Sequence, residues 1–346
     1  MAFTLKDLAE LSALPFDTII DARSPSEFAE DHIPGAINLP SLTDAERAEV
    51  GTIYVQEEPF KARKIGAAYV ARNVANYLQG PLAHHEGGWQ PLVYCWRGGQ
   101  RSNAFASILS QIGWRAEVVA GGYKSYRSLV VSLLHDTAIP NEVILIEGGT
   151  GSAKTQLLHH IADQGGQVID LEGAAEHRGS LFGQVGARQP SQKMFESRIA
   201  ETVVGLSPDR PVFVEAESSK VGDCLVPPSL WKAMLRARYV EIAAPPQARA
   251  RHVVDTYPDI IADPDRLSGI LGKLAKFRGH AQVEAWQEMA DAQNWTGLAQ
   301  DLIERHYDPA YKRIRAGEDP LDTFALADLS EMTLAQTAAE IVARFG

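Results

Sequence analysis

Short apolar runs alternate with longer segments of helical character along most of the chain. Runs typical of buried strands occupy residues 18–21, 91–94, 143–146, 167–172, 211–218 and 239–243. Helical segments are predicted at residues 25–28, 43–80, 102–109, 156–161, 190–196 and 231–237. From Pro246 onward the pattern is almost wholly helical. This alternation predicts an α/β protein built from parallel sheets flanked by helices.

A chain of 346 residues is long enough for about two domains that each bury a core. We predict an N-terminal α/β domain over residues 1–136, with a parallel sheet flanked by helices. A second, doubly wound α/β domain is predicted over residues 137–250, because its strands and helices alternate after a glycine-rich turn. A helical C-terminal region is predicted over residues 251–346.

The composition is that of a soluble globular protein, with 45% hydrophobic and 22% charged residues. Cys95 and Cys224 are the two cysteines, so we expect no disulfide framework and a cytoplasmic location. The N-terminus lacks the pattern of a signal peptide, and no apolar run approaches the ~20 residues of a membrane span. The net charge of −11 argues against a general nucleic-acid coat, although it allows a local basic groove.

Residues 147–155, Glu-Gly-Gly-Thr-Gly-Ser-Ala-Lys-Thr, join a predicted strand to a predicted helix. Glycines in this context let backbone N–H groups surround an anion, and the helix N-terminus adds partial positive charge. Lys154 is expected to reach phosphate oxygens, and the Thr155 hydroxyl is a candidate metal ligand. Ala153 departs from the phosphate-loop pattern, which has glycine there. The predicted phosphate- or diphosphate-binding residues are Gly148, Gly149, Thr150, Gly151, Ser152, Ala153, Lys154 and Thr155.

Cys95 follows a predicted strand and precedes a glycine turn and a helix N-terminus. Oriented N–H groups and the positive charges of Arg97 and Arg101 favour a thiolate, so we predict that all three residues are catalytic. The alternative, a small buried hydrophobe, fits these surroundings poorly. It fits Cys224 well, because Cys224 has no such neighbours.

Four polar residues of the second domain are candidate substrate-binding or metal-side groups. His177 and Arg178 lie in a glycine-bearing segment where a substrate loop is expected, although a lone histidine is often structural. Glu215 and Glu217 follow an apolar strand, where a nucleotide-binding fold places its metal-side carboxylate. Mg²⁺ is therefore a candidate ligand, but no certain metal-binding set can be identified.

Basic residues recur in the C-terminal half, and we predict a surface that follows a nucleic-acid backbone. Any one run is also compatible with a solvated helix face. That simpler interpretation is preferred for Lys61, Arg63, Lys64 and Arg72 in the first domain. The three C-terminal runs consist of Arg236, Arg238, Arg249, Arg251 and His252; Lys273, Lys276, Arg278 and His280; and Arg305, His306, Lys312, Arg313 and Arg315, with Tyr307 and Tyr311 interleaved.

The first domain resembles the rhodanese family. The resemblance rests on residues 21–28, 32–36, the segment that begins at Cys95, and residues 121–123. It implies a parallel sheet flanked by helices and a cysteine that carries sulfur or selenium. Five residues separate Cys95 from Arg101, one more than in the usual sulfurtransferase loop. This spacing also resembles the loop of cysteine phosphatases, which leaves the reaction at Cys95 open.

The whole chain resembles the bacterial tRNA 2-selenouridine synthase family, in which a rhodanese domain is fused to a P-loop domain. The residues that carry this resemblance are 95–99, 147–155, 176–183, 189–196 and 214–218. It implies a cytoplasmic transferase that converts wobble 2-thiouridine of tRNA to 2-selenouridine through an S-geranyl-2-thiouridine intermediate. Geranyl diphosphate and selenophosphate are the implied co-substrates, with no tightly bound cofactor, and Cys95 is expected to act in the selenium step.

Two other classes of function are compatible with the residues. A rhodanese sulfurtransferase fused to a P-loop kinase would phosphorylate a small molecule with ATP. A non-enzymatic tRNA-binding module would retain a degenerate Cys95 segment. The joint presence of Cys95, Arg97, Arg101 and Lys154 argues against the second alternative. The sequence does not indicate an oligomeric state.

Overall fold

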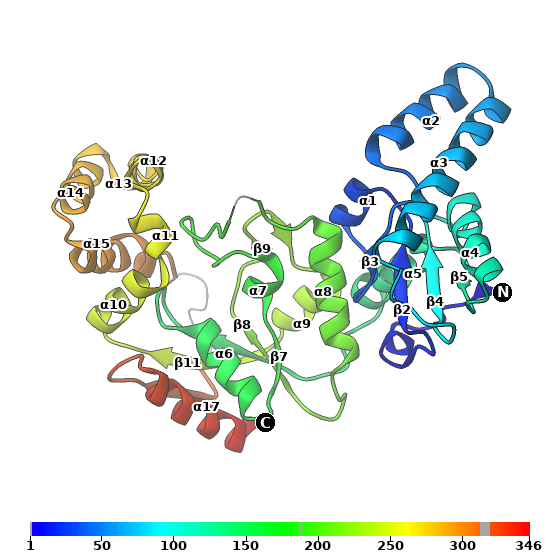
Figure 1. Cartoon of the computed structure of the whole chain (residues 1–346). Coiled ribbons are helices and arrows are strands. Elements are labelled where there is room, and N and C mark those ends of the chain that lie inside the picture. Colours follow the sequence, from blue (N-terminus) through cyan, green and yellow to red (C-terminus); the bar gives the residue numbers. More distant parts are fainter. Residues whose placement is uncertain (1, 187, 312–318) are drawn as a thin grey trace. The chain divides into compact units, whose positions relative to one another are not determined.

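The computed structural model describes residues 2–186, 188–311 and 319–346 of the chain, and describes the side chains up to residue 309 and from residue 319. Two compact units emerge from its internal contacts. Unit 1 consists of Met1–Ala138 and Pro190–Gly205, and unit 2 consists of Ile139–Gln189 and Leu206–Gly346. Figure 1 labels many of the helices and strands of both units.

Unit 1 is built on a five-stranded parallel sheet, as the sequence predicted. Its strands lie in the order β1-β5-β4-β2-β3. Their bounds are β1 (Ala2–Phe3), β2 (Thr18–Asp21), β3 (Ile37–Asn38), β4 (Pro91–Tyr94) and β5 (Glu117–Val119). The central strand β4 ends immediately before Cys95, which places that residue at the carboxyl edge of the sheet.

Helices surround the sheet of unit 1. They are α1 (Pro25–Glu30), α2 (Asp44–Gln56), α3 (Pro59–Gln79), α4 (Gln100–Ile112), α5 (Tyr123–Val131) and α8 (Gln192–Val204), with the short helices η1 (Leu8–Ala13) and η2 (Ser132–Asp136). The predicted helical stretch 43–80 is two helices, because Pro59 starts α3 and cannot continue α2. The core between sheet and helices includes the fully buried Ile20, Val93 and Phe105.

Helix α8 belongs to unit 1 although its residues follow the phosphate-loop segment in sequence. It packs against α5, η1 and η2. Its inner face buries Phe195, Ile199 and Ala200. The sequence placed this helix in the 137–250 domain, because periodicity along a chain does not reveal which core an amphipathic helix covers.

Unit 2 contains a second five-stranded parallel sheet, in the order β12-β11-β6-β8-β7. Its strands are β6 (Val143–Glu147), β7 (Gln167–Ile169), β8 (Val212–Glu215), β11 (Arg238–Ala243) and β12 (Asp322–Ala325); β9 (Lys220–Val221) and β10 (Cys224–Leu225) form a separate antiparallel pair. The helices beside them in sequence are α6 (Lys154–Asp163), α7 (Leu171–Ala175), α9 (Pro228–Met234) and α17 (Glu331–Phe345). The central position of β6 puts the following turn at a crevice of the sheet.

The C-terminal segment contributes a strand and a helix to this α/β layer. Strand β12 pairs with β11, and α17 packs against α6 through a shared apolar core (Figure 1). The expectation of an almost wholly helical chain after Pro246 missed β12. Of its four residues only Phe324 is buried, so the strand lacks the apolar run that marked the others.

A helical region separates β11 from β12 in sequence, as predicted. Its elements are α10 (Pro246–Thr256), α11 (Pro258–Ile261), α12 (Pro264–Lys273), α13 (Ala275–Arg278), α14 (His280–Asp291), α15 (Trp295–Leu302), η3 (Ile303–Tyr307) and α16 (Asp308–Tyr311). Several of them pack around the fully buried Trp286. Among the described residues, no helix is long and apolar enough to cross a membrane.

Candidate active sites in the two units

The phosphate loop, which we define as residues 148–155, adopts a closed turn between β6 and α6. Ala153, at the position where glycine was expected, has a left-handed conformation with φ of 60°. This is the conformation for which glycine is favoured, so the loop keeps the shape of the pattern despite the substitution. Lys154 Nζ donates to the carbonyl oxygen of Gly148 at 3.1 Å. Its ammonium group therefore lies across the turn, where an anion would meet it.

Arg249 of α10 holds the phosphate loop from behind. Its Nε donates to the carbonyl oxygen of Thr150 at 2.9 Å, and its Nη2 lies 2.6 Å from Asp308 Oδ1. A Cβ atom at Gly149 would lie 2.6 Å from the guanidinium, so glycine is required for this close approach. The prediction that Arg249 belongs to a nucleic-acid-binding surface is wrong, because its side chain is buried and committed to the loop.

Carboxyl groups line the floor beside the loop. The Thr155 hydroxyl donates to Glu172 Oε2 at 2.7 Å, and the backbone N–H of Glu172 donates to Glu215 Oε1 at 3.0 Å. Glu215 is completely buried at the end of β8. Burial, reinforced by the negative charges of Asp170 and Glu172, raises the pKa of Glu215 well above its ordinary value. The surroundings of Glu215 therefore favour the protonated carboxyl group more than water does.

Glu217 and Glu172 form an interacting pair in the same floor. Burial, with the negative charge of Glu172, raises the pKa of Glu217 to about 7. Burial also raises the pKa of Glu172, against the opposing effect of its bond from Thr155. No group of three or more His, Cys, Asp or Glu side chains is placed to hold a metal ion in the described ranges. The metal-side role of Glu215 and Glu217 stays a prediction.

A cavity of about 220 Å³ opens over the phosphate loop. Lys154, Thr155, Glu172 and Glu217 line it, and so does Arg178. The candidate substrate-binding residue Arg178 therefore lies beside the phosphate loop. Its guanidinium donates to Asp259 Oδ1 at 2.9 Å and lies 4.7 Å from the centre of the Tyr257 ring.

His177 does not line this cavity. Its Nδ1 accepts the N–H of Gly179 at 3.2 Å, and burial lowers its pKa, so the ring is a neutral part of the turn. The observed contact is the structural one that a lone histidine usually makes.

The second candidate site is the Cys95 loop, which we define as residues 95–101. The Cys95 Sγ atom is buried and lies 3.1 Å from the Ser102 hydroxyl oxygen. Helix α4 begins directly after Gly99 and has no side-chain cap, so its first-turn N–H groups are available to an anion. Ser102 can stabilise a Cys95 thiolate by donating its hydroxyl proton.

Two glycines shape the Cys95 loop. Gly98 and Gly122 have φ of 64° and 61°, and a Cβ atom at Gly122 would collide with the carbonyl oxygen of Cys95. The N–H of Tyr123, the next residue, donates to that same oxygen at 2.8 Å. The turn at residues 121–123 is therefore packed directly against the Cys95 loop, which explains why the two segments occur together in the pattern.

The two arginines of the loop differ in their surroundings. Arg101 Nη1 donates to Glu27 Oε2 at 2.9 Å. Burial disfavours the Glu27 carboxylate, but Arg101 outweighs this effect and lowers the pKa of Glu27. Glu27 thus neutralises the positive charge of Arg101, which the sequence analysis expected to act on Cys95. Arg97 is exposed, and its side chain makes no hydrogen bond or ion pair with any other described residue.

The start of α8 lies beside the Cys95 loop within unit 1. Lys193 Nζ is 6.0 Å from the centre of the Trp96 ring and 2.7 Å from Glu30 Oε1. Glu196, one turn later, pairs with Arg127 of α5. The segment 189–196, which the sequence analysis placed in the second domain, therefore contributes its helix to the unit that holds Cys95.

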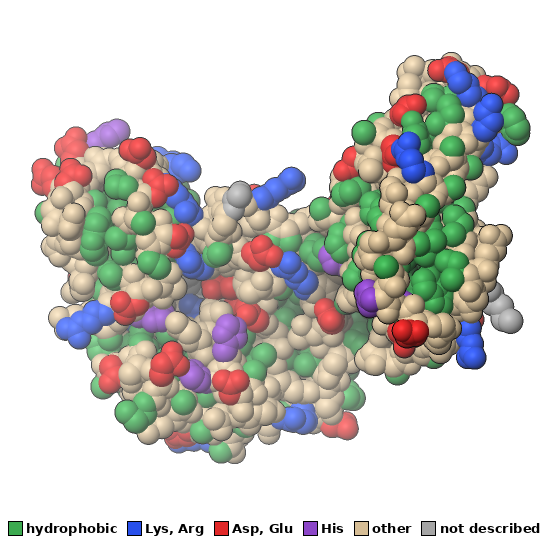
Figure 2. All heavy atoms as spheres, viewed as in Figure 1, with side chains coloured by type: hydrophobic (Ala, Val, Ile, Leu, Met, Phe, Trp, Pro, Cys, Tyr) green, Lys and Arg blue, Asp and Glu red, His purple; other side chains and the backbone are tan. Residues whose placement is uncertain are grey.

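Some side chains of the three C-terminal basic runs form hydrogen bonds or ion pairs within the protein. Arg238 pairs with Glu142 at 2.5 Å, and Arg278 donates to the carbonyl oxygen of His306 at 2.8 Å. Basic and acidic side chains are interspersed over the face drawn in Figure 2. Lys312, Arg313 and Arg315 lie outside the described residues, as does the side chain of Tyr311. A continuous basic surface therefore stays a prediction.

Four residues contact these sites although the sequence analysis did not assign them to either site. Ser102 directly follows the Cys95 loop, and Glu172 ends the predicted strand 167–172. Their positions in the sequence could therefore have indicated that they lie near Cys95 and Thr155. Glu27 and Arg249 reach their sites from distant parts of the chain, and nothing in the local pattern indicated that they would contact Arg101 and Thr150.

Family comparisons agree with this architecture. A model of the rhodanese-like domain matches residues 4–129, and a model of the tRNA 2-selenouridine synthase AAA domain matches residues 141–269. A tRNA 2-selenouridine synthase of Nitrosomonas europaea is 35% identical over 69% of this chain and 63% of its own length. In that comparison the chain spans less than two thirds of its relative.

Two other relatives are matched over more of their length. The tRNA 2-selenouridine synthase of Shewanella denitrificans is 31% identical, and that of Verminephrobacter eiseniae is 33% identical. Each comparison covers 85% of this chain and 87% of the relative. The chain belongs to the tRNA 2-selenouridine synthase family.

Proposed function

We propose that this protein converts wobble 2-thiouridine of tRNA to 2-selenouridine through an S-geranyl-2-thiouridine intermediate. One observation carries the proposal: the chain presents two anion-binding turns of different chemistry. The phosphate loop has a lysine and no thiol, whereas the Cys95 loop has a thiol beside an uncapped helix. Two successive reactions, one with a diphosphate and one with selenophosphate, would use these two turns.

The first step is alkylation at the phosphate loop. The thiocarbonyl sulfur of 2-thiouridine forms a bond to C1 of the geranyl group, and the C1–O bond to diphosphate breaks. The N3 proton of the base is released as the C2–N3 double bond forms. The electron pair of the broken C1–O bond leaves with diphosphate, so the developing negative charge requires stabilisation. Lys154 and the N–H groups at the start of α6 supply it, and Arg178 lies in the wall of the same cavity.

The second step replaces sulfur with selenium. The selenium of selenophosphate bonds to C2 of the base, and S-geranyl leaves as geranyl thiolate. Water then cleaves the phosphorus–selenium bond and releases phosphate. The first-turn N–H groups of α4 and the exposed Arg97 attract selenophosphate. Cys95, with Ser102 hydrogen-bonded to its sulfur, assists the delivery of selenium to the base.

The experiment supplies the purified protein with tRNA containing 2-thiouridine. Geranyl diphosphate and selenophosphate are added separately and together, and the nucleosides are analysed by mass spectrometry. We expect S-geranyl-2-thiouridine with geranyl diphosphate alone and 2-selenouridine with both. Absence of both products under every combination would refute the proposal.

A further inference from the structure

An apolar pocket adjoins the phosphate-loop cavity in unit 2. It holds about 80 Å³ of open space, several times what a single water molecule requires, so it exceeds an ordinary packing defect. Thr150, Ser180, Val253 and Tyr257 line both the pocket and the phosphate-loop cavity. A ligand whose phosphate groups lie on the loop therefore has this pocket beside it.

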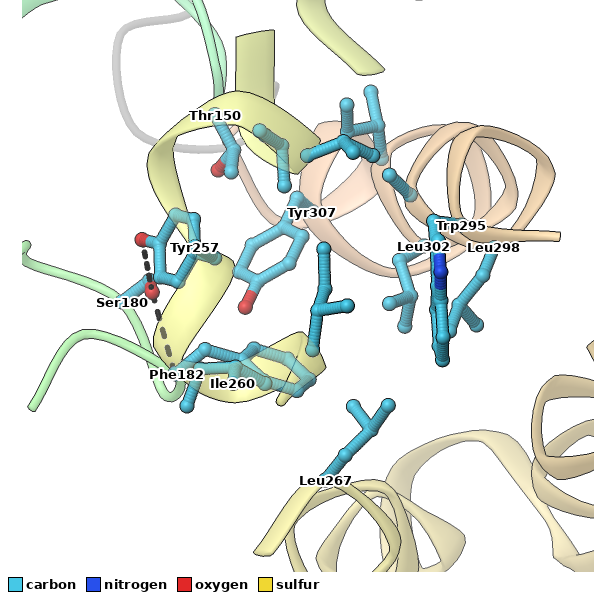
Figure 3. A pocket seen from close by; sticks show the side chains of 15 residues that line it. Thr150, Ser180, Phe182, Tyr257, Ile260, Leu267, Trp295, Leu298, Leu302 and Tyr307 are labelled. Atoms are coloured by element: carbon cyan, nitrogen blue, oxygen red, sulfur yellow. Dashed lines mark hydrogen bonds between the residues drawn. The ribbon is translucent and has the colours of Figure 1, made fainter. Parts of the chain in front are cut away.

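The pocket offers no charged side chain among the described residues that line it. The polar atoms at its mouth satisfy one another: the Ser180 hydroxyl oxygen lies 3.0 Å from the Tyr257 hydroxyl oxygen and accepts the N–H of Phe182 at 3.2 Å (Figure 3). The other polar side-chain groups of the described lining residues are the hydroxyls of Thr150 and Tyr307 and the indole N–H of Trp295. A nucleobase would therefore bury several ring nitrogens and an amino group here with few partners, at a high desolvation cost. A hydrocarbon chain has no such groups.

The far wall is formed by helix α15. Trp295, Leu298 and Leu302 stand together on that side in Figure 3, away from Thr150 and Ser180. Leu298 and Leu302 are buried and also belong to the helical core, whereas Trp295 is half-buried and packs against that core. A change at Trp295 can therefore alter the depth of the pocket without removing a central core residue.

We propose that this pocket holds the hydrocarbon chain of an allylic diphosphate donor, and that Trp295 limits the length of the chain it accepts. The proposal rests on the proposed function, because it needs a donor whose diphosphate binds the phosphate loop. Each methylene group of the chain that enters the pocket strengthens binding about fourfold, so chain length and pocket depth are coupled.

The test measures S-alkylation of 2-thiouridine tRNA with geranyl diphosphate (ten carbons) and farnesyl diphosphate (fifteen carbons). Inorganic diphosphate serves as a competing inhibitor that reports on the phosphate loop alone. Trp295→Ala should raise the farnesyl-to-geranyl ratio of kcat/KM by roughly tenfold or more. Its inhibition by diphosphate should stay within about twofold of the wild-type value, because the phosphate contacts are unchanged.

Ile261→Trp is the complementary variant, since Ile261 lines the pocket and is only partly buried. Filling the pocket should lower kcat/KM for geranyl diphosphate by roughly tenfold or more, again with diphosphate inhibition intact. Phe277→Ala removes an exposed aromatic ring of the same helical region that does not line the pocket, and should change neither quantity.

The outcomes separate the two proposals. The pocket assignment would be overturned if folded Trp295→Ala kept the wild-type farnesyl-to-geranyl ratio and folded Ile261→Trp kept the wild-type kcat/KM for geranyl diphosphate. Alkylation by the wild-type protein would still support the proposed function in that case. A wild-type protein that alkylates tRNA with neither diphosphate would instead refute the proposed function itself. Inhibition of S-alkylation by ATP that is lost in Ile261→Trp would identify a nucleobase pocket and overturn the assignment.

Discussion

Arg249 donates its Nε–H to the carbonyl oxygen of Thr150 across 2.9 Å, while its terminal nitrogens bind Asp308. The helical region and the phosphate loop of unit 2 are thus joined by one buried guanidinium. Because arginine stays charged and donates in a fixed planar geometry, this contact sets the position of the loop carbonyl independently of any ligand.

Replacing Arg249 by leucine should therefore destabilise the protein and weaken phosphate binding together. Removing one partner of a largely buried ion pair leaves Asp308 uncompensated and the Thr150 carbonyl without its donor, at a cost of roughly 3 kcal/mol in the free energy of unfolding. Thermal unfolding and diphosphate inhibition measure the two effects. Arg251→Ala is the control, since Arg251 is exposed on the same helix. Equal behaviour of the two variants would contradict the assigned role.

Lys154→Ala should lower the rate of geranylation by about a hundredfold or more, because the departing diphosphate loses its cationic partner. Conversion of tRNA that already carries S-geranyl-2-thiouridine should be unaffected. Lys220→Ala, which removes an exposed lysine of the same unit, is the matched control. The opposite pattern, with selenation lost and geranylation kept, would show that the two turns have been assigned the wrong way round.

Cys95→Ala should abolish selenation and leave geranylation intact, since only the selenium step involves the Cys95 loop. Cys224→Ala controls for loss of a buried thiol, because Cys224 is equally buried but lies outside both loops. Ser102→Ala should reduce selenation by roughly tenfold through loss of its hydroxyl beside the thiolate. Full selenation by Cys95→Ala would remove Cys95 from the mechanism.

The raised pKa of Glu217 makes stability depend on pH. The pKa is about 7 in the folded protein, against an ordinary value of 4.5. In between, the folded state holds a proton that the unfolded state has lost, so stability decreases as the pH rises from about 4.5 to about 7. Glu217→Gln removes this dependence and should stabilise the protein relative to wild type by on the order of 1–3 kcal/mol at pH 8, but little at pH 4.5.

Thermal unfolding of both proteins across this pH range tests the prediction. Glu241→Gln is a control for an exposed glutamate of the same sheet. A constant difference between Glu217→Gln and wild type at every pH would show that Glu217 ionises normally.

The sequence predicted the sites best where one continuous segment builds them. Residues 148–155 and 95–101 each join a strand to a helix, and local spacing is enough to recognise such a turn. Ala153 departs from the sequence pattern but not from the shape of the turn, because the turn imposes a left-handed conformation on a residue that does not favour it.

What the sequence could not predict depends on contacts between distant segments. Arg249 looked like one of several surface arginines, since only the fold brings it within reach of Thr150 and Asp308. Helix α8 had the periodicity of any amphipathic helix, and packing alone assigned it to unit 1. The apolar pocket is likewise assembled from the phosphate loop, residues 180–182 and three stretches of the helical region, none of which marks it alone.

The most direct test of the account follows the intermediate itself. Isolated tRNA carrying S-geranyl-2-thiouridine is incubated with the wild-type protein and selenophosphate, without geranyl diphosphate, and its nucleosides are analysed by mass spectrometry. The account predicts 2-selenouridine together with released geranyl thiol. Selenation that starts from 2-thiouridine but never from the S-geranyl nucleoside would contradict it.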